Sequence, residues 1–262
     1  MKKSKAALKR RLNYHYKYFD KSKISPDPLE FPHRYKDPRD IEISAFISSI
    51  FAYGNIKQII KSLNTVHNVM ENQPFNFVLN FSYDEDKEKF KNIKHRFYTD
   101  GDIAVLFFIL NKVYEVYGSL KYLFLLYYFD SDKNLKNTIS FFSNNLLDIG
   151  ASKAKISGGL KFMFPDPFKK SACKRINLFL RWMVRKDELD FGLWKEIPTD
   201  KIIIPVDTHV ARICRELNLT KQKNISWKMA EEITEKLKLF DREDPVKYDF
   251  AICHIGMRKM EL

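Results

Sequence analysis

Asp207 is the carboxylate in this sequence whose position best suits chemistry. It follows an apolar, β-branched segment, residues 202–206, and the apolar residues after it recur at helical spacing. Two roles fit this place. Asp207 can cap a helix by accepting hydrogen bonds from the first backbone N–H groups, or it can act as a catalytic carboxylate on a rigid scaffold. The local sequence favours the cap, and catalysis requires a partner elsewhere in the chain.

Two lysines upstream offer such a partner. Lys170 and Lys174 are four residues apart, so they would share one face of a helix predicted over residues 171–185. Like charge and partial burial both favour a neutral amine, which attacks sugar or carbonyl carbons. An aspartate nearby would stabilise the cationic sugar that forms when a base leaves. The alternative is that both lysines are solvated surface charges.

The pattern of apolar residues along the whole chain indicates helices. Glycine is scarce, at 8 of 262 residues, and long segments carry apolar residues at helical spacing, so an all-α fold is predicted. A four-proline segment over residues 26–38 predicts an extended connector, and residues 155–160 a flexible segment. Asp37 and Asp244 are expected to begin helices as capping residues. The main helices are predicted near residues 1–23, 37–54, 56–70, 103–117, 120–129, 134–147, 171–185, 207–217, 227–240 and 244–256, with one more within 72–99.

The formal net charge of +13 and the isoelectric point of about 9.4 predict a polyanionic partner such as nucleic acid. The alternative is a compositional bias toward lysine. Three isolated cysteines and six scattered histidines show neither a disulfide framework nor metal-ligand spacing, so no metal is predicted and a reducing cytoplasm is expected. The longest apolar runs are too short to span a bilayer, and no apolar segment of a secretory signal follows the basic first residues.

Residues 164–219 resemble the core of the helix-hairpin-helix DNA glycosylase superfamily, which includes endonuclease III. In that superfamily a Leu-Pro-Gly-Val-Gly hairpin precedes Lys-Thr-Ala and, later, Val-Asp-Thr-His. This chain has Phe-Pro-Asp-Pro-Phe-Lys-Lys-Ser-Ala at 164–172 and Val-Asp-Thr-His at 206–209. The last predicted helix, at 246–256, is similar to the closing helix of the superfamily.

Nearly the whole chain also resembles a bacterial family of uncharacterised proteins, through Ser-Ala-Cys-Lys-Arg at 171–175 and Phe-Leu-Arg-Trp-Met-Val-Arg at 179–185. Its layout is similar to that of the archaeal 8-oxoguanine glycosylases, which also place a long connector between lysine and aspartate. Here the separation is 33 residues from Lys174 (207 minus 174) or 37 from Lys170 (207 minus 170).

The resemblance implies a two-lobed helical fold with a central cleft and a degenerate helix-hairpin-helix. One lobe would be residues 38–185, and the other residues 1–37 plus 186–262. The implied function is base-excision repair of DNA: a glycosylase acting on a damaged purine such as 8-oxoguanine, with a possible lyase step through a lysine Schiff base. Asp207 would stabilise the sugar cation or activate a water. The iron–sulfur cysteines of endonuclease III have no counterpart here, so no cofactor is implied.

The implied partner is duplex DNA with a flipped base, with RNA left open, and a monomer is expected. Direct alignment of the hairpin favours Lys170 as the nucleophile, whereas the longer connector favours Lys174, which we rank first. Both hairpin glycines are replaced, by Asp166 and Phe168, so the phosphate site is expected to use Lys169 and the helix start instead. The expected nucleic-acid-binding residues are Lys169, Arg181, Arg185, His209, Arg212, Asn55 and Gln58.

Two other functions remain compatible with the sequence. One is a nucleic-acid-binding protein that keeps the scaffold without catalysis, which the missing hairpin glycines favour. It predicts salt-dependent binding of DNA or RNA and no cleavage. The other is a helical interaction protein whose positive charge reflects composition alone, and it predicts no nucleic-acid binding at physiological salt.

Overall fold

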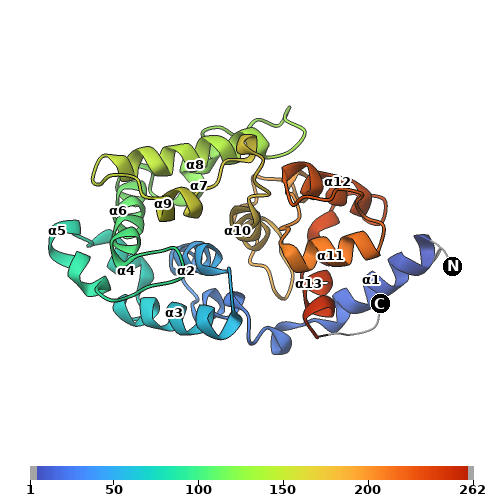
Figure 1. The fold of residues 1–262 in the computed structure, drawn as a ribbon, viewed down its shortest axis with the longest axis horizontal. Helices are drawn as coiled ribbons and strands as arrows, with labels where there is room; N and C mark the ends of the chain where they lie inside the picture. The colour runs from blue at the N-terminus through green and yellow to red at the C-terminus, as the bar shows by residue number, and fades with distance from the viewer. Residues whose placement is uncertain (1–4, 259–262) are drawn as a thin grey trace. The chain divides into compact units, whose positions relative to one another are not determined.

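The computed structural model describes the backbone of residues 5–258 and the side chains of residues 5–254. Helices supply the regular structure of this part of the chain (Figure 1), and the only strand-like pairings within it are two isolated bridges, His95 with Tyr98 and Lys186 with Phe191. The predicted all-α class is therefore confirmed. No helix among the described residues is long and apolar enough to cross a membrane.

The chain divides into two compact units. The terminal unit comprises residues 5–24, 133–135 and 167–258 of the described chain, and the middle unit comprises residues 25–132 and 136–166. These boundaries differ from those of the expected lobes. Residues 167–185 belong to the terminal unit, and residues 25–37 to the middle one. As a result, the lysine helix and the Asp207 helix lie in the same unit.

The middle unit is built around α2 (Pro38–Phe51), which is buried on nearly every side. Its start is as predicted, because the Asp37 side chain accepts a hydrogen bond from Arg39 N and Pro38 occupies the first turn. The longest helix of the unit is α6 (Asp100–Tyr117), which begins with a reciprocal cap between Thr99 and Asp102. The other helices are α3 (Ile56–Val69), α4 (Pro74–Leu79), α5 (Tyr83–Asp86), α7 (Leu120–Leu125), α8 (Lys136–Ala151) and α9 (Gly158–Met163).

Phenylalanine forms much of the core of the middle unit. Phe107 stacks on Phe90 with ring centroids 4.7 Å apart, and Phe46 packs edge-on against Phe142 at 6.1 Å. Edge-on and offset contacts of this kind add to the burial of aromatic area. The aromatic residues that are abundant in the sequence therefore hold the scaffold of this unit.

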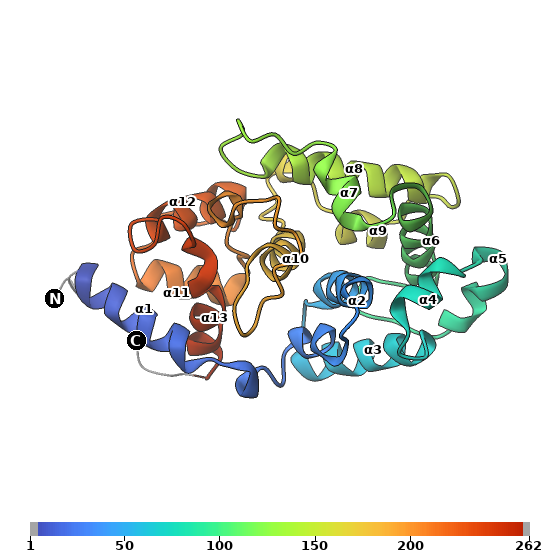
Figure 2. The same cartoon turned by 180° about the vertical axis from the view of Figure 1, so that it is seen from behind.

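The terminal unit contains α1 (Lys5–Tyr18), α10 (Lys174–Val184), α11 (Thr208–Glu216), α12 (Trp227–Leu237) and α13 (Asp249–Arg258). Helix α13 lies next to α11 and α1 and contacts both of them (Figures 1 and 2). Helix α10 is buried along most of its length, with Trp182 and Phe179 fully enclosed. It therefore contributes its side chains to a core and not to the surface.

Several connecting segments differ from expectation. The four-proline segment forms two short 3₁₀ turns (Pro28–Glu30 and Pro32–Arg34), and residues 72–99 contain α4, α5 and a further 3₁₀ turn (Lys87–Phe90). The segment expected to be flexible leads directly into α9, capped by Ser157. The Asp244 side chain forms no cap and instead accepts hydrogen bonds from Arg185. The carboxylate thus binds a partner from a distant part of the sequence. Local sequence patterns do not reveal such a partner.

Candidate functional site

Lys174 and Asp207 meet at the starts of two helices of the terminal unit. Lys174 is the first residue of α10, and Asp207 immediately precedes α11. The distance from Lys174 Nζ to Asp207 Oδ2 is 3.9 Å, and the two side chains are 26% and 31% exposed. A half-exposed pair contributes little to stability. It remains accessible to a ligand, and an amine beside a carboxylate can carry out nucleophilic chemistry.

The two carboxylate oxygens of Asp207 make different contacts. Oδ1 accepts hydrogen bonds from the backbone N–H groups of His209 (2.9 Å) and Val210 (3.0 Å), so the predicted capping role is confirmed. Oδ2 is the oxygen nearest to Lys174. The buried residues 202–206 hold the carboxylate from the other side, and Ile204 N donates to Thr234 Oγ1. The cap thus fixes the orientation in which the second oxygen faces the amine.

The start of α10 is held by a tight turn. Cys173 lies in the left-handed region at φ 47°, and its N–H donates to Ser171 Oγ at 3.1 Å. Asn177 Nδ2 donates to the carbonyl oxygen of Ala172 at 3.0 Å. These contacts set the direction in which the lysine side chain leaves the backbone.

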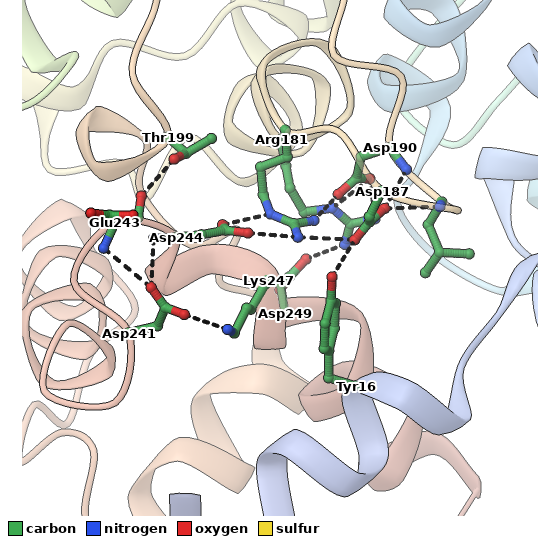
Figure 3. Close-up of polar contacts among 12 residues, drawn as sticks. Tyr16, Arg181, Asp187, Asp190, Thr199, Asp241, Glu243, Asp244, Lys247 and Asp249 are labelled. Carbon is green, nitrogen blue, oxygen red and sulfur yellow. Dashed lines mark hydrogen bonds and ion pairs between the residues drawn. The ribbon is translucent and has the colours of Figure 1, made fainter.

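A buried ion network lies along the same helix (Figure 3). Arg181 Nη1 donates to Asp249 Oδ2 at 2.6 Å, and its Nε and Nη2 donate to Asp190 Oδ1. Arg185 pairs with Asp190, Asp187 and Asp244. Lys174 and Arg181 are seven residues apart on α10 and share one side of it, and Arg185 immediately follows the last residue of the helix, Val184.

The network is electrostatically coupled to the Lys174–Asp207 pair. Burial raises the pKa of Asp249, while the neighbouring Arg181 and, to a smaller extent, Lys174 lower it, and the charge of Asp207 raises it further. Burial also raises the pKa of Asp190, to about 6, against the opposing effect of Arg181 and Arg185. Asp190 is therefore ionised at neutral pH and satisfied by guanidinium donors.

Two expected nucleic-acid-binding residues require correction. The side chains of Arg181 and Arg185 are only 3% exposed and donate to aspartates inside the unit, so they are not positioned to contact a phosphate. Helical spacing correctly groups the two arginines on one face. It does not say whether that face meets solvent or buried carboxylates. Two of the carboxylates here, Asp187 and Asp190, come from the segment just after the helix, and the other two, Asp244 and Asp249, from a distant part of the chain.

The expected helical pairing of Lys170 with Lys174 is also wrong. Helix α10 begins only at Lys174, and Lys170 lies outside it with φ 67° in the left-handed region. Lys170 is exposed, as is Lys169 in the preceding 3₁₀ turn (Pro167–Lys169). Lys174 alone of the two lysines forms an ion pair with Asp207 among the described contacts.

The remaining expected residues lie on exposed surface. His209 and Arg212 are exposed on α11, where Arg212 Nη1 pairs with Glu216 Oε1 at 2.8 Å. Asn55 and Gln58 belong to the middle unit. The Asn55 side chain caps α3 by accepting from Lys57 N at 3.0 Å, and Gln58 donates to Ser62.

An exposed aromatic surface in the middle unit was not predicted. Phe97 is 58% exposed and stacks on Tyr53 with ring centroids 5.9 Å apart. The Arg96 guanidinium lies 4.8 Å from the Tyr53 ring, and a Cβ at Gly54 would come within 2.8 Å of Arg96 Cδ. Aromatic faces beside a cation are typical platforms for nucleic-acid bases. The available signal was the Arg-Phe-Tyr run at 96–98 within a basic segment.

The described residues contain no group of three or more His, Cys, Asp or Glu side chains arranged to hold a metal ion. Each of the four aspartates of the buried network already pairs with a guanidinium group of Arg181 or Arg185.

Over residues 27–258 the chain matches a family described as "Protein of unknown function (DUF2400)". No curated protein matches the chain, and neither does any solved structure.

Proposed function

Since the chain belongs to the DUF2400 family, whose description assigns no function, we propose one from its own residues: excision of a damaged base from DNA, with Lys174 as the amine nucleophile. Asp207 is the carboxylate that stabilises the positive sugar. The observation that carries this proposal is the 3.9 Å distance between Lys174 Nζ and Asp207 Oδ2. The two residues are 33 apart in sequence (207 minus 174) and both begin helices of one compact unit.

In the proposed reaction the Lys174 side chain first gives up a proton to solvent, and its amine then attacks the sugar carbon that carries the base. The bond from sugar to base breaks, and the base leaves with the bonding electrons and takes up a proton. Loss of a proton and opening of the ring give a Schiff base, which is the route to strand cleavage. Positive charge develops on the sugar before the new bond is complete, and Oδ2 of Asp207 lies where it can stabilise that charge. If the amine does not reach the sugar, the same carboxylate can activate a water, and the reaction then stops at the abasic site.

DNA as the substrate is supported by the charge and by the aromatic surface. The net charge of +13 favours a polyanion. The stacked Phe97 and Tyr53 offer a surface for a base. A damaged purine such as 8-oxoguanine is the proposed lesion, because the long connector between lysine and aspartate resembles that of the archaeal 8-oxoguanine glycosylases. The two-lobed cleft and the degenerate hairpin belong to the same proposal, and the order α9, 3₁₀ turn, α10 is compatible with the hairpin.

Borohydride trapping tests the proposal. The protein is incubated with duplexes that carry 8-oxoguanine, uracil, an oxidised pyrimidine or an abasic site, and a covalent protein–DNA band is sought. We expect a band that disappears in the Lys174→Gln variant and persists in Lys170→Gln. The second variant is the matched control, because Lys170 is an exposed lysine that lies outside α10. Asp207→Asn is expected to slow trapping by roughly 100-fold or more, because it removes the charge that faces the sugar.

Asp207→Asn also separates catalysis from folding. Asparagine is as good a capping residue as aspartate, whereas Asp207→Ala should lower the free energy of unfolding by about 1 kcal/mol. A band that survives in Lys174→Gln would refute the nucleophile assignment. If no substrate gives a band or releases a base while the protein still binds DNA, the non-catalytic nucleic-acid-binding alternative replaces the proposal.

A further inference from the structure

Helix α1 has an unusual charge composition. Its sequence, residues 5–18, contains five lysines and arginines and no acidic residue. Like charges at helical spacing repel one another and lower helix stability. None of these five basic side chains forms an ion pair among the described residues, whereas Asp20, which follows the helix, pairs with Lys23. The positive charge of α1 is thus not compensated within the protein.

The inner face of α1 anchors it to the terminal unit. Leu12 is buried, and so is Phe19, which immediately follows the helix and packs edge-on against Phe250 of α13 with ring centroids 5.5 Å apart. Tyr16 Oη donates to Asp187 Oδ2 at 3.2 Å, which ties the helix to the buried ion network (Figure 3). Tyr248 Oη donates to Asn13 Oδ1 at 2.8 Å. The helix is therefore a fixed part of the unit that carries Lys174 and Asp207.

The outer face of α1 combines cations with aromatic rings. Arg10, Tyr14, Lys17 and Tyr18 follow one another at intervals of four, three and one residues, so they form one continuous strip. All four side chains are exposed, and Tyr14 is 66% exposed. Lys9 lies beside the strip and is exposed as well. We call these five residues the α1 strip.

We propose that the α1 strip binds the sugar–phosphate backbone of a nucleic acid. Lysine and arginine pair with phosphates without reading sequence, and tyrosine adds a hydroxyl donor and a stacking face. This inference rests on the proposed function, because it takes nucleic acid as the partner, and it assigns backbone contact to a surface remote in sequence from Lys174. An anionic membrane is the poorer occupant, because the apolar side chains that a membrane-bound helix inserts, Leu12 and Phe19, are already buried.

The experiment measures binding of an undamaged duplex as a function of salt concentration. The test variant is Arg10→Gln with Lys17→Gln. The matched control is Lys195→Gln with Lys228→Gln, which removes the same charge from exposed positions of the same unit. Each phosphate contact contributes about 0.9 to the slope of log affinity against log salt. We expect the slope to fall by about 2 in the test variant and to stay near the wild-type value in the control. Both variants should unfold at the wild-type urea midpoint.

Two results would overturn the inference. One is an equal salt slope in the test and control variants. The other is a loss of binding to phosphatidylserine–phosphatidylcholine vesicles in the test variant with DNA affinity unchanged, which would assign the strip to a membrane surface. Borohydride trapping at saturating protein distinguishes these failures from a failure of the proposed function, since Lys174 chemistry can persist when the strip plays no part.

Discussion

At the scale of single residues, one side chain can combine a structural role with a place in the candidate site. Asp207 shows this clearly, because one carboxylate oxygen caps α11 and the other faces Lys174. The two roles considered from the sequence are therefore compatible, and the cap would support the proposed chemistry by restricting rotation of the side chain. A residue in this position can be tested for chemistry only with a substitution that retains the cap.

His67 illustrates how burial controls a single titration. Its ring is fully buried and stacks on Tyr35, whose hydroxyl lies 2.7 Å from Nδ1. Burial lowers the pKa of His67 from 6.5 to about 3, with a smaller contribution from the Arg34 charge. The folded protein therefore keeps this histidine neutral at a pH where the unfolded chain protonates it.

Stability should accordingly fall as the pH drops below about 6.5. The unfolded state binds one more proton than the native state between pH 6.5 and 3, so the free energy of unfolding increases with pH over that range. Between pH 7 and pH 5 we expect His67 to account for a loss of about 2 kcal/mol, at 1.36 kcal/mol per unit. Urea unfolding of wild type and His67→Gln at both pH values measures this. Parallel losses in the two proteins would contradict the assignment.

At the scale of elements, α9 is held in place by a contact so close that it leaves no room for a side chain. The start of α9 packs against the reciprocal cap of α6, where the Asp102 carboxylate accepts from Thr99 N and from the Ser157 hydroxyl. A Cβ at Gly159 would lie 2.3 Å from Asp102 Oδ2 and 2.8 Å from the carbonyl oxygen of Phe97. Only glycine fits there, and the contact fixes α9 relative to α6 and to the backbone of Phe97.

Two neighbouring glycines make this testable. Gly159→Ala should lower the free energy of unfolding by about 1–3 kcal/mol, because a backbone oxygen and a fully engaged carboxylate cannot move aside. Gly158→Ala is the matched control, since a Cβ there meets no atom within 4 Å. It should change stability by less than about 0.5 kcal/mol or increase it slightly. If urea unfolding gave the same change in the free energy of unfolding for both variants, the close contact at Gly159 would not constrain the helix.

At the scale of the molecule, long-range ion pairs close the terminal unit. Arg181 of α10 and Arg185, which immediately follows α10, bind aspartates from the segment after α10, from position 244 and from the start of α13. Tyr16 of α1 joins through Asp187 (Figure 3). The network therefore links parts of the chain 171 residues apart (187 minus 16), and a separate hydrogen bond from Tyr248 to Asn13 also joins the two ends of the unit. Charges enclosed to this degree must be paired, because an unpaired one is costly.

Breaking the network should therefore cost far more than breaking a surface pair. Asp190→Asn removes the negative charge between the two arginines and should lower the free energy of unfolding by about 3–5 kcal/mol. Glu216→Gln, which breaks the exposed pair with Arg212, is the control and should change stability by less than about 0.5 kcal/mol. A small effect of Asp190→Asn would mean that water reaches the guanidinium groups.

The sequence by itself determined the helical class and most helix positions, because these follow from local spacing and capping. The starts of α2 at Asp37 and of α11 at Asp207 are examples. The sequence also indicated Lys174 and Asp207 as candidate site residues, partly through the resemblance to the DNA glycosylases.

Only the tertiary structure decided which partners those side chains meet. It placed Arg181 and Arg185 among buried aspartates, redirected Asp244 from a cap to Arg185, and set Lys174 rather than Lys170 beside Asp207. It also brought Phe97 onto Tyr53. The physical reason is common to all of these: a helical period defines a face, but long-range packing determines whether that face meets water, a carboxylate or another ring.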